Sequence, residues 1–80
     1  MMQEMEERKN VIIEILMEYG CATALQIVGL ANRKHNVVMT PSQVSAVLRP
    51  MVAKAEAASG KDVKGTTAYW LTDTFKEELK

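Results

Sequence analysis

The stretch TPSQVSAVLRPM, residues 40–51, carries several signals of a helix start within its first four positions. Thr40 suits the N-cap position, and the proline after it suits the first helical position, where a missing N–H breaks no hydrogen bond. Gln43 stands three residues after Thr40, the spacing of a capping box. Met39 and Val44 have the spacing of a hydrophobic staple across the same boundary. The sequence therefore predicts a helix that begins immediately after Thr40.

The two faces of this helix differ in composition. Apolar residues at helical spacing predict the buried face, and they are Val44, Val47, Leu48 and Met51. The outward face is small and polar, with Ser42, Ala46, Arg49 and Ala53, flanked by Gln43 and Ser45. Such a helix fits the DNA major groove, where serine, arginine and alanine can each contact bases or phosphates. Packing against another protein explains the face equally well.

Pro50 interrupts this helix, because a proline inside a helix removes one hydrogen bond and costs on the order of 3 kcal/mol. Alanine, lysine and glutamate beyond it favour a helix that continues. However, TTAYWL reads as a strand and needs a pairing partner, for which residues 55–59 are the nearest candidate. We therefore predict that the helix stops near Ala53 or Lys54. The polar loop bracketed by Gly60 and Gly65 then joins the two strands.

Three further elements flank this region. An apolar stripe predicts a helix over residues 3–19, and TALQ, at capping-box spacing, predicts a second helix after Thr23. The link CAT between them is predicted as a strand of one or two residues, and Thr72 as the cap of a short last helix. The stripe of the first helix comprises Met5, Ile12, Ile15, Leu16 and Tyr19. The predicted core comprises Ile12, Ile15, Leu16, Ile27, Val44, Val47, Leu48 and Trp70. Tyr69 is the alternative to Trp70, because strand neighbours face opposite sides.

The chain has 80 residues, which predicts a single domain spanning residues 1–80. Its apolar and charged fractions are those of an ordinary globular protein. Glu14 and Glu18 interrupt the longest apolar run, so no membrane span is expected, and the acidic N-terminus is unlike a signal peptide. Cys21 is the only cysteine, which favours the cytoplasm, and we expect its thiol in the core.

The formal net charge is zero, but the charges are unevenly distributed. Residues 1–20 carry a net charge of −3, residues 21–65 a net charge of +4 and residues 66–80 a net charge of −1. The positive part therefore contains the capped helix and the lysine-bearing loop. This distribution is compatible with one anion-binding face and equally with a mixed solvated surface.

The predicted order is helix, short link, helix, helix, strand, lysine-bearing loop, strand, helix. Over roughly residues 5–79 this order resembles the winged helix-turn-helix superfamily, whose fold is mostly α with a small β-hairpin. TPSQVSAVLRPM resembles a recognition helix. YWLTD, residues 69–73, resembles the Tyr-x-Leu-Thr that ends the wing in MarR-like regulators. The chain departs from the superfamily at Pro50 and in having alanines where a glycine often follows the recognition helix.

The resemblance implies a small transcriptional regulator that binds double-stranded DNA. The helix from Thr40 would enter the major groove, and the loop from Gly60 to Gly65 would be the wing. The candidate DNA-binding residues are Thr40, Ser42, Gln43, Ser45, Ala46 and Arg49 on the helix, Lys61 and Lys64 on the wing, and Arg33, Lys34 and Lys54 at the phosphate backbone. The alternative is a winged helix used for protein contact, as an adaptor, an inhibitor or a subunit of a nucleic-acid machine. The neutral net charge favours that alternative.

Ile13 and Met17 lie off the apolar stripe of the first helix. A broad buried face and a dimer seam explain them equally. Because one small module reads few base pairs, we expect a homodimer that pairs its first helices, with the C-terminal helix as a further candidate contact. Met1, Met2 and Met5 add apolar surface nearby.

Enzymatic chemistry finds little support in the sequence. His35 is the only histidine and has no Cys, Asp or Glu at metal-ligand spacing. No phosphate-binding glycine loop, nucleophile elbow or carboxylate pair is present. We therefore expect no enzymatic activity, no metal and no cofactor, and no small-molecule effector is evident.

Overall fold

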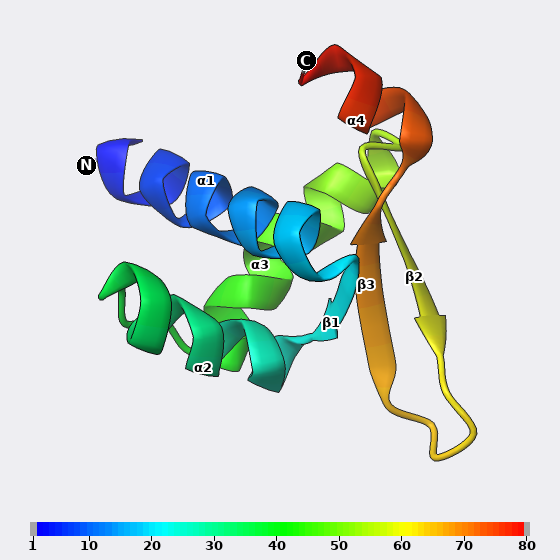
Figure 1. Ribbon diagram of the computed structural model, residues 1–80, viewed down its shortest axis with the longest axis horizontal. Coiled ribbons are helices and arrows are strands. Elements are labelled where there is room, and N and C mark those ends of the chain that lie inside the picture. The colour runs from blue at the N-terminus through cyan, green and yellow to red at the C-terminus, as the bar shows by residue number, and fades with distance from the viewer. Residues whose placement is uncertain (1, 80) are drawn as a thin grey trace.

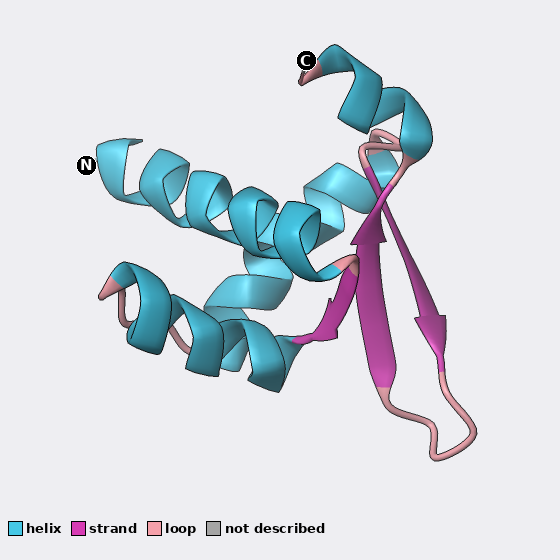
Figure 2. Cartoon of the chain, viewed as in Figure 1, coloured by secondary structure: helices cyan, strands magenta, loops and turns pink. Residues whose placement is uncertain are grey.

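The computed structural model describes the chain from residue 2 to residue 79, and its side chains from residue 6. The elements follow the predicted order, and their bounds are α1 Met2–Tyr19, β1 Cys21–Thr23, α2 Ala24–His35, α3 Pro41–Ala53, β2 Ala57–Lys61, β3 Thr67–Leu71 and α4 Asp73–Glu78. Helices α1, α2 and α3 pack together, and the hairpin of β2 and β3 projects away from them (Figure 1, Figure 2). None of the helices in this part of the chain has the length and apolar character of a membrane span.

Two capping boxes set the starts of α2 and α3. The Thr40 N–H donates to Gln43 Oε1 at 2.9 Å, and the Gln43 N–H donates to Thr40 Oγ1 at 3.2 Å. Thr23 and Gln26 repeat these two hydrogen bonds at the start of α2, with the same two lengths. These bonds satisfy N–H groups that a helix start leaves without intrahelical partners. The predicted start of both helices is therefore confirmed.

Helix α3 continues past Pro50 for one turn and ends at Ala53, with Lys54 as its C-cap. The ending is a Schellman motif, because the Glu56 N–H donates to the Met51 carbonyl at 2.8 Å and the Ala55 N–H to the Val52 carbonyl at 3.1 Å. Ala55 takes the left-handed position of this motif, with φ 60°. The predicted stop near Ala53 or Lys54 is confirmed.

The second strand begins two residues later than predicted, at Ala57 rather than residue 55. The Schellman turn uses the N–H groups of residues 55 and 56, so neither N–H can donate to the sheet. At its other end β2 extends through Gly60 and Lys61, which pair with Ala68 and Thr67. The prediction that the wing loop spans Gly60–Gly65 is therefore wrong. The loop covers residues 62–66, and Lys61 belongs to a strand.

The three strands are antiparallel in the order β1-β3-β2, so β3 is central. Leu71 and its partner Ala57 are buried on the helix-facing side. Alternation along the strands places Tyr69 on that side and turns Trp70 and its partner Cys21 to the outer side. Trp70 is 39% exposed and Cys21 is exposed, so both predictions of a core position are wrong. Tyr69, the alternative, packs against the core.

The core between the three helices and the sheet contains every other residue predicted for it. Its fully buried large side chains are Ile12, Ile15, Leu16, Ile27, Leu48, Met51, Leu71 and Val44. Tyr19 departs from the predicted buried stripe of the first helix, because it lies at the last position of α1 and is 43% exposed. The predictions for Met1, Met2 and Met5 concern side chains outside the described residues.

Candidate nucleic-acid interface

The outward face of α3 forms a shallow hollow lined by Pro41, Ser42, Ser45, Ala46 and Arg49. Four of the predicted contact residues thus share one surface. Ser42, Ala46 and Arg49 are exposed, and Ser45 is half-buried. Arg49 supplies the only positive charge of the hollow. It adds five N–H donors, arranged so that they can bond one acceptor pair in a bidentate way.

Thr40 and Gln43 form the capping box that the sequence predicted for them. Their side chains bond each other's backbone N–H groups in the capping box. These two residues therefore fix the direction in which α3 leaves the preceding loop. They thereby fix the orientation of its outward face.

A second groove begins at Ser45 and runs between the start of α2 and the end of β3 that adjoins the wing loop. It is lined by Thr23, Ala24, Leu25, Ser45, Thr66, Thr67 and Tyr69. Five of these residues carry a hydroxyl group, which can both donate and accept a hydrogen bond. The start of α2 adds the positive end of a helix dipole. The groove therefore suits an anion without presenting a full positive charge.

Of the five hydroxyl residues of this groove, sequence reasoning proposed Ser45 as a DNA contact and missed the other four. One signal was available for two of them, because Thr67 and Tyr69 alternate with Leu71 and must share its face of the strand. Thr23 and Thr66 could not be placed in this way, because their position depends on how α2 and the hairpin meet.

The wing loop is tightly closed by the Asp62 side chain. Asp62 Oδ1 accepts hydrogen bonds from the backbone N–H groups of Lys64 at 2.8 Å and Thr66 at 3.0 Å. The Asp62 backbone also forms hydrogen bonds with Thr66 and Gly65, each 3.0 Å long. Gly65 has φ +82°, which a side chain would strain. Lys61 leads into this loop and Lys64 lies within it, so both lysines belong to the wing.

Lys54 lies beside a third groove, which separates the end of α3 from α1. Its other lining residues are Lys9, Ala46, Val47, Pro50, Met51 and Glu56. Lys9 Nζ is 3.7 Å from Glu56 Oε1, an oxygen that is buried and accepts no hydrogen bond. No sequence pattern singles out Lys9, since its place beside Lys54 arises only from the packing of α1 against α3.

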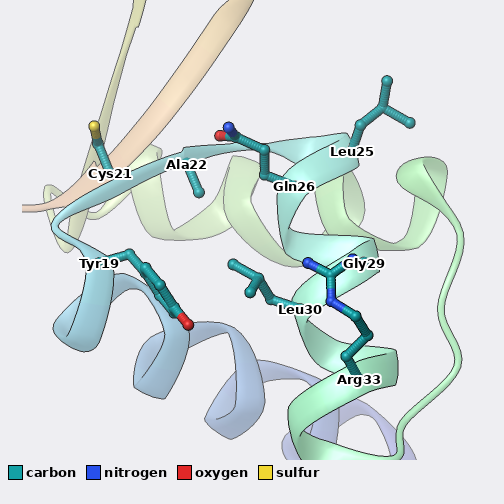
Figure 3. Close-up of a pocket in the computed structure, with 8 residues that line it drawn as sticks. All are labelled: Tyr19, Cys21, Ala22, Leu25, Gln26, Gly29, Leu30 and Arg33. Atoms are coloured by element: carbon teal, nitrogen blue, oxygen red, sulfur yellow. The ribbon is translucent and has the colours of Figure 1, made fainter.

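Arg33 and Lys34 lie away from the outward face of α3. Arg33 lines a groove between the end of α1, β1 and α2, and its guanidinium folds back over Gly29 (Figure 3). Lys34 Nζ is 3.3 Å from Glu18 Oε1 and 5.2 Å from the centre of the Tyr19 ring. Hydrogen bonds to Tyr19 and Glu18, together with the charge of Glu18, raise the pKa of Lys34 above its ordinary value of 10.5. These contacts tie α2 to α1.

His35 also joins α2 to α1, because its Nδ1 is 3.4 Å from Glu14 Oε2. From residue 2 to residue 79, no three His, Cys, Asp or Glu side chains are grouped so that they could hold a metal ion.

Solved structures similar to this chain include transcriptional regulators. A regulator from Clostridium thermocellum superposes with a TM-score of 0.76 at 15% identity, over 89% of this chain and 71% of the other. A MarR family regulator from Silicibacter pomeroyi superposes with a TM-score of 0.74 at 23% identity, over 96% of this chain and 49% of the other. Bacillus subtilis PadR in complex with operator DNA superposes with a TM-score of 0.75 at 21% identity, over 89% of this chain and 43% of the other. This chain thus spans about half the length of the last two.

The sequence matches no protein-family profile and none of the curated proteins with which it was compared. Its likeness to known proteins is therefore a likeness of fold. The MarR family and PadR regulators are winged helix-turn-helix proteins, and this chain has that fold, as its sequence predicted.

Proposed function

We propose that this protein is a DNA-binding transcriptional regulator that places α3 in the major groove and the wing over the adjacent minor groove. The observation that carries this proposal is the continuity of two surfaces through Ser45. Ser45 belongs both to the hollow on α3 and to the hydroxyl-lined groove beneath the wing. A helix in one groove and a wing over the next must straddle the phosphate backbone between them. The hydroxyl-lined groove binds that phosphate backbone.

Each part of the surface has its own role. Arg49 bonds the O6 and N7 atoms of a guanine, while Ser42, Ser45 and Ala46 allow α3 to approach base edges closely. Lys61, Lys64 and Lys54 neutralise phosphates, which positions the protein without reading sequence. Thr40 and Gln43 hold the helix start. Our proposal leaves Arg33 and Lys34 out of the DNA-binding surface, because Arg33 lines the groove beside α1 and Lys34 pairs with Glu18 of α1.

The solved structure of PadR with operator DNA supports the proposal, because a protein of the same fold was crystallised on DNA. The neutral net charge of this chain does not oppose it. Hydroxyl and backbone N–H groups can hold a phosphate, and they release no counterions on binding. We therefore expect the affinity for DNA to depend only modestly on salt concentration.

The test compares variants on a random-sequence duplex library and on the sequences selected from it. Arg49→Ala is expected to reduce discrimination between selected and random duplexes by about 1–3 kcal/mol. Replacing Lys61 and Lys64 together by alanine is expected to weaken all duplexes alike. The slope of log affinity against log salt should also become shallower, by about 0.9 for each phosphate that is no longer neutralised.

Arg33→Ala is the matched control for Arg49→Ala, because it removes the same charge from the groove beside α1. It should leave both affinity and discrimination unchanged. If neither Arg49→Ala nor the double lysine variant changes affinity or its salt slope, the protein does not read DNA with this surface. The small face of α3 would then belong to a protein contact.

We further propose that the protein binds as a homodimer that pairs α1 with its copy. Met17 is 46% exposed, whereas Ile13 is half-buried and packs against the core. The pairing therefore depends on Met17 more than on Ile13. A single monomeric species in sedimentation at high micromolar concentration would contradict it, and Met17→Glu is expected to dissociate a dimer without unfolding the chain.

A further inference from the structure

The most exposed apolar side chain of the wing stands at its tip. Val63 is fully exposed and follows Asp62, the residue that closes the loop. Single exposed apolar residues are common on protein surfaces and need no explanation by themselves. Val63 differs by its position, because it lies between Lys61 and Lys64 at the end of a hairpin that extends away from the helices (Figure 1).

The tip is also held in one conformation. Asp62 accepts two backbone hydrogen bonds through its side chain, and its own N–H and carbonyl bond Thr66 and Gly65 across the loop. A loop closed in this way loses little conformational freedom when it binds. The loop therefore holds the exposed apolar side chain of Val63 in one position before binding. The lysines on either side of it attract phosphates.

We propose that Val63 is a specificity residue that enters the DNA minor groove and disfavours G·C pairs where the wing lands. This inference rests on the proposed function. In the minor groove, A·T pairs present only acceptors at the groove floor, whereas each G·C pair adds the N2 amine of guanine. That amine projects into the groove and meets the valine methyl groups before they reach the floor. Valine cannot accept its hydrogen bond, so a covered amine loses its water without a replacement.

Two synthetic duplexes isolate this effect. Poly(dI-dC) and poly(dG-dC) present the same major groove edges, and they differ in the minor groove by the amine that inosine lacks. Contacts of α3 in the major groove are therefore held constant. The wild-type protein is expected to bind poly(dI-dC) about fivefold more tightly than poly(dG-dC), which corresponds to one donor left unsatisfied.

The variant Val63→Thr keeps the shape of the side chain and replaces one methyl group by a hydroxyl that can accept from the amine. It is expected to bring the affinity ratio of the two polymers close to one. Val38→Thr is the matched control. Val38 is 80% exposed and lies beside Glu7 and Arg8 of α1, so this variant should keep the wild-type ratio.

The outcomes separate this inference from the proposed function. If the wild type binds no duplex at all, both fail. If the wild type binds both polymers equally, or if Val63→Thr keeps the wild-type ratio, the role of Val63 is overturned while DNA binding stands. If Val63→Thr weakens both polymers by the same factor, Val63 contributes buried area but no discrimination, and the inference again fails.

Discussion

The indole ring of Trp70 on β3 covers Gly60 on β2. A Cβ atom added to Gly60 would stand 3.0 Å from Cη2 of that ring and 3.4 Å from Cζ3. Both distances are tighter than most carbon contacts in proteins, so a side chain at position 60 needs the ring to shift by a few tenths of an ångström. Glycine is therefore favoured here by the close approach of an aromatic side chain.

This contact predicts the effect of Gly60→Val. The added side chain should lift the indole off the sheet and lower the free energy of unfolding by about 1–3 kcal/mol, as overpacking does. Trp70 is the only tryptophan, so its emission should shift to longer wavelength as the ring becomes more exposed. Ser59→Val is the control, because Ser59 pairs with Tyr69 on the other face of the sheet. Unchanged emission from Gly60→Val would contradict the packing of the ring.

Ala55 is predicted to be a site where glycine stabilises the protein. Its φ of 60° costs an alanine roughly 1–2 kcal/mol, and glycine avoids that cost. Glycine also gives the unfolded chain more freedom, which offsets part of the gain. We expect Ala55→Gly to raise the free energy of unfolding by about 0.5–1 kcal/mol in urea denaturation.

Ala53→Gly provides the opposite control two residues earlier. Ala53 is the last residue of α3, so glycine there should lower the free energy of unfolding by up to about 1 kcal/mol. The same sign for both variants would show that Ala55 does not occupy the left-handed position.

Thr40 is predicted to stabilise α3 through its side-chain oxygen. Thr40→Ala leaves the Gln43 N–H without its partner and should cost about 1 kcal/mol of unfolding free energy. Thr40→Ser keeps the oxygen and should cost much less. Since the Thr40 side chain is exposed, loss of packing does not explain a difference between the two variants. Equal stability of the alanine and serine variants would refute the capping role.

The titration of Lys34 is predicted to report the link between α2 and α1. Its pKa is raised above 10.5, so the charged form is favoured in the folded state. The contribution to stability is then fully present below the unfolded pKa, and it disappears as pH rises through the folded value. An NMR titration of the Lys34 side chain should show a pKa above 10.5 that falls in Glu18→Gln. A pKa that does not respond to this substitution would argue against the ion pair.

The elements that the sequence predicts well are those specified by neighbouring residues. The capping boxes of Thr23 and Thr40 need only residues three positions apart, and both are present in the structure. The predicted start of β2 is wrong because residues 55 and 56 form the Schellman turn, which Thr72, distant in sequence, also contacts. The Thr72 N–H donates to the Glu56 carbonyl at 3.1 Å, and this bond helps to fix the turn.

The candidate site is predictable to a similar degree. A helical wheel assigns Ser42, Ala46 and Arg49 to one face, because that assignment needs only the helical repeat. Arg33 and Lys34 are assigned to the same surface only because they are positively charged. The packing of α2 against α1 turns both away, and no local pattern specifies that packing. The orientation of Trp70 is ambiguous for the related reason that alternation fixes the two faces of a strand but not which face is inside.

The Thr72 side chain links the base of the hairpin to α4. Its hydroxyl donates to the Ala55 carbonyl at 2.7 Å, and the same oxygen accepts from the Phe75 N–H at 3.3 Å. One side chain thus fastens the turn after α3 to the first turn of α4, at the base of the hairpin. Because the hairpin and α4 share this anchoring side chain, we expect a change in the tilt of the hairpin to move the C-terminal helix with it.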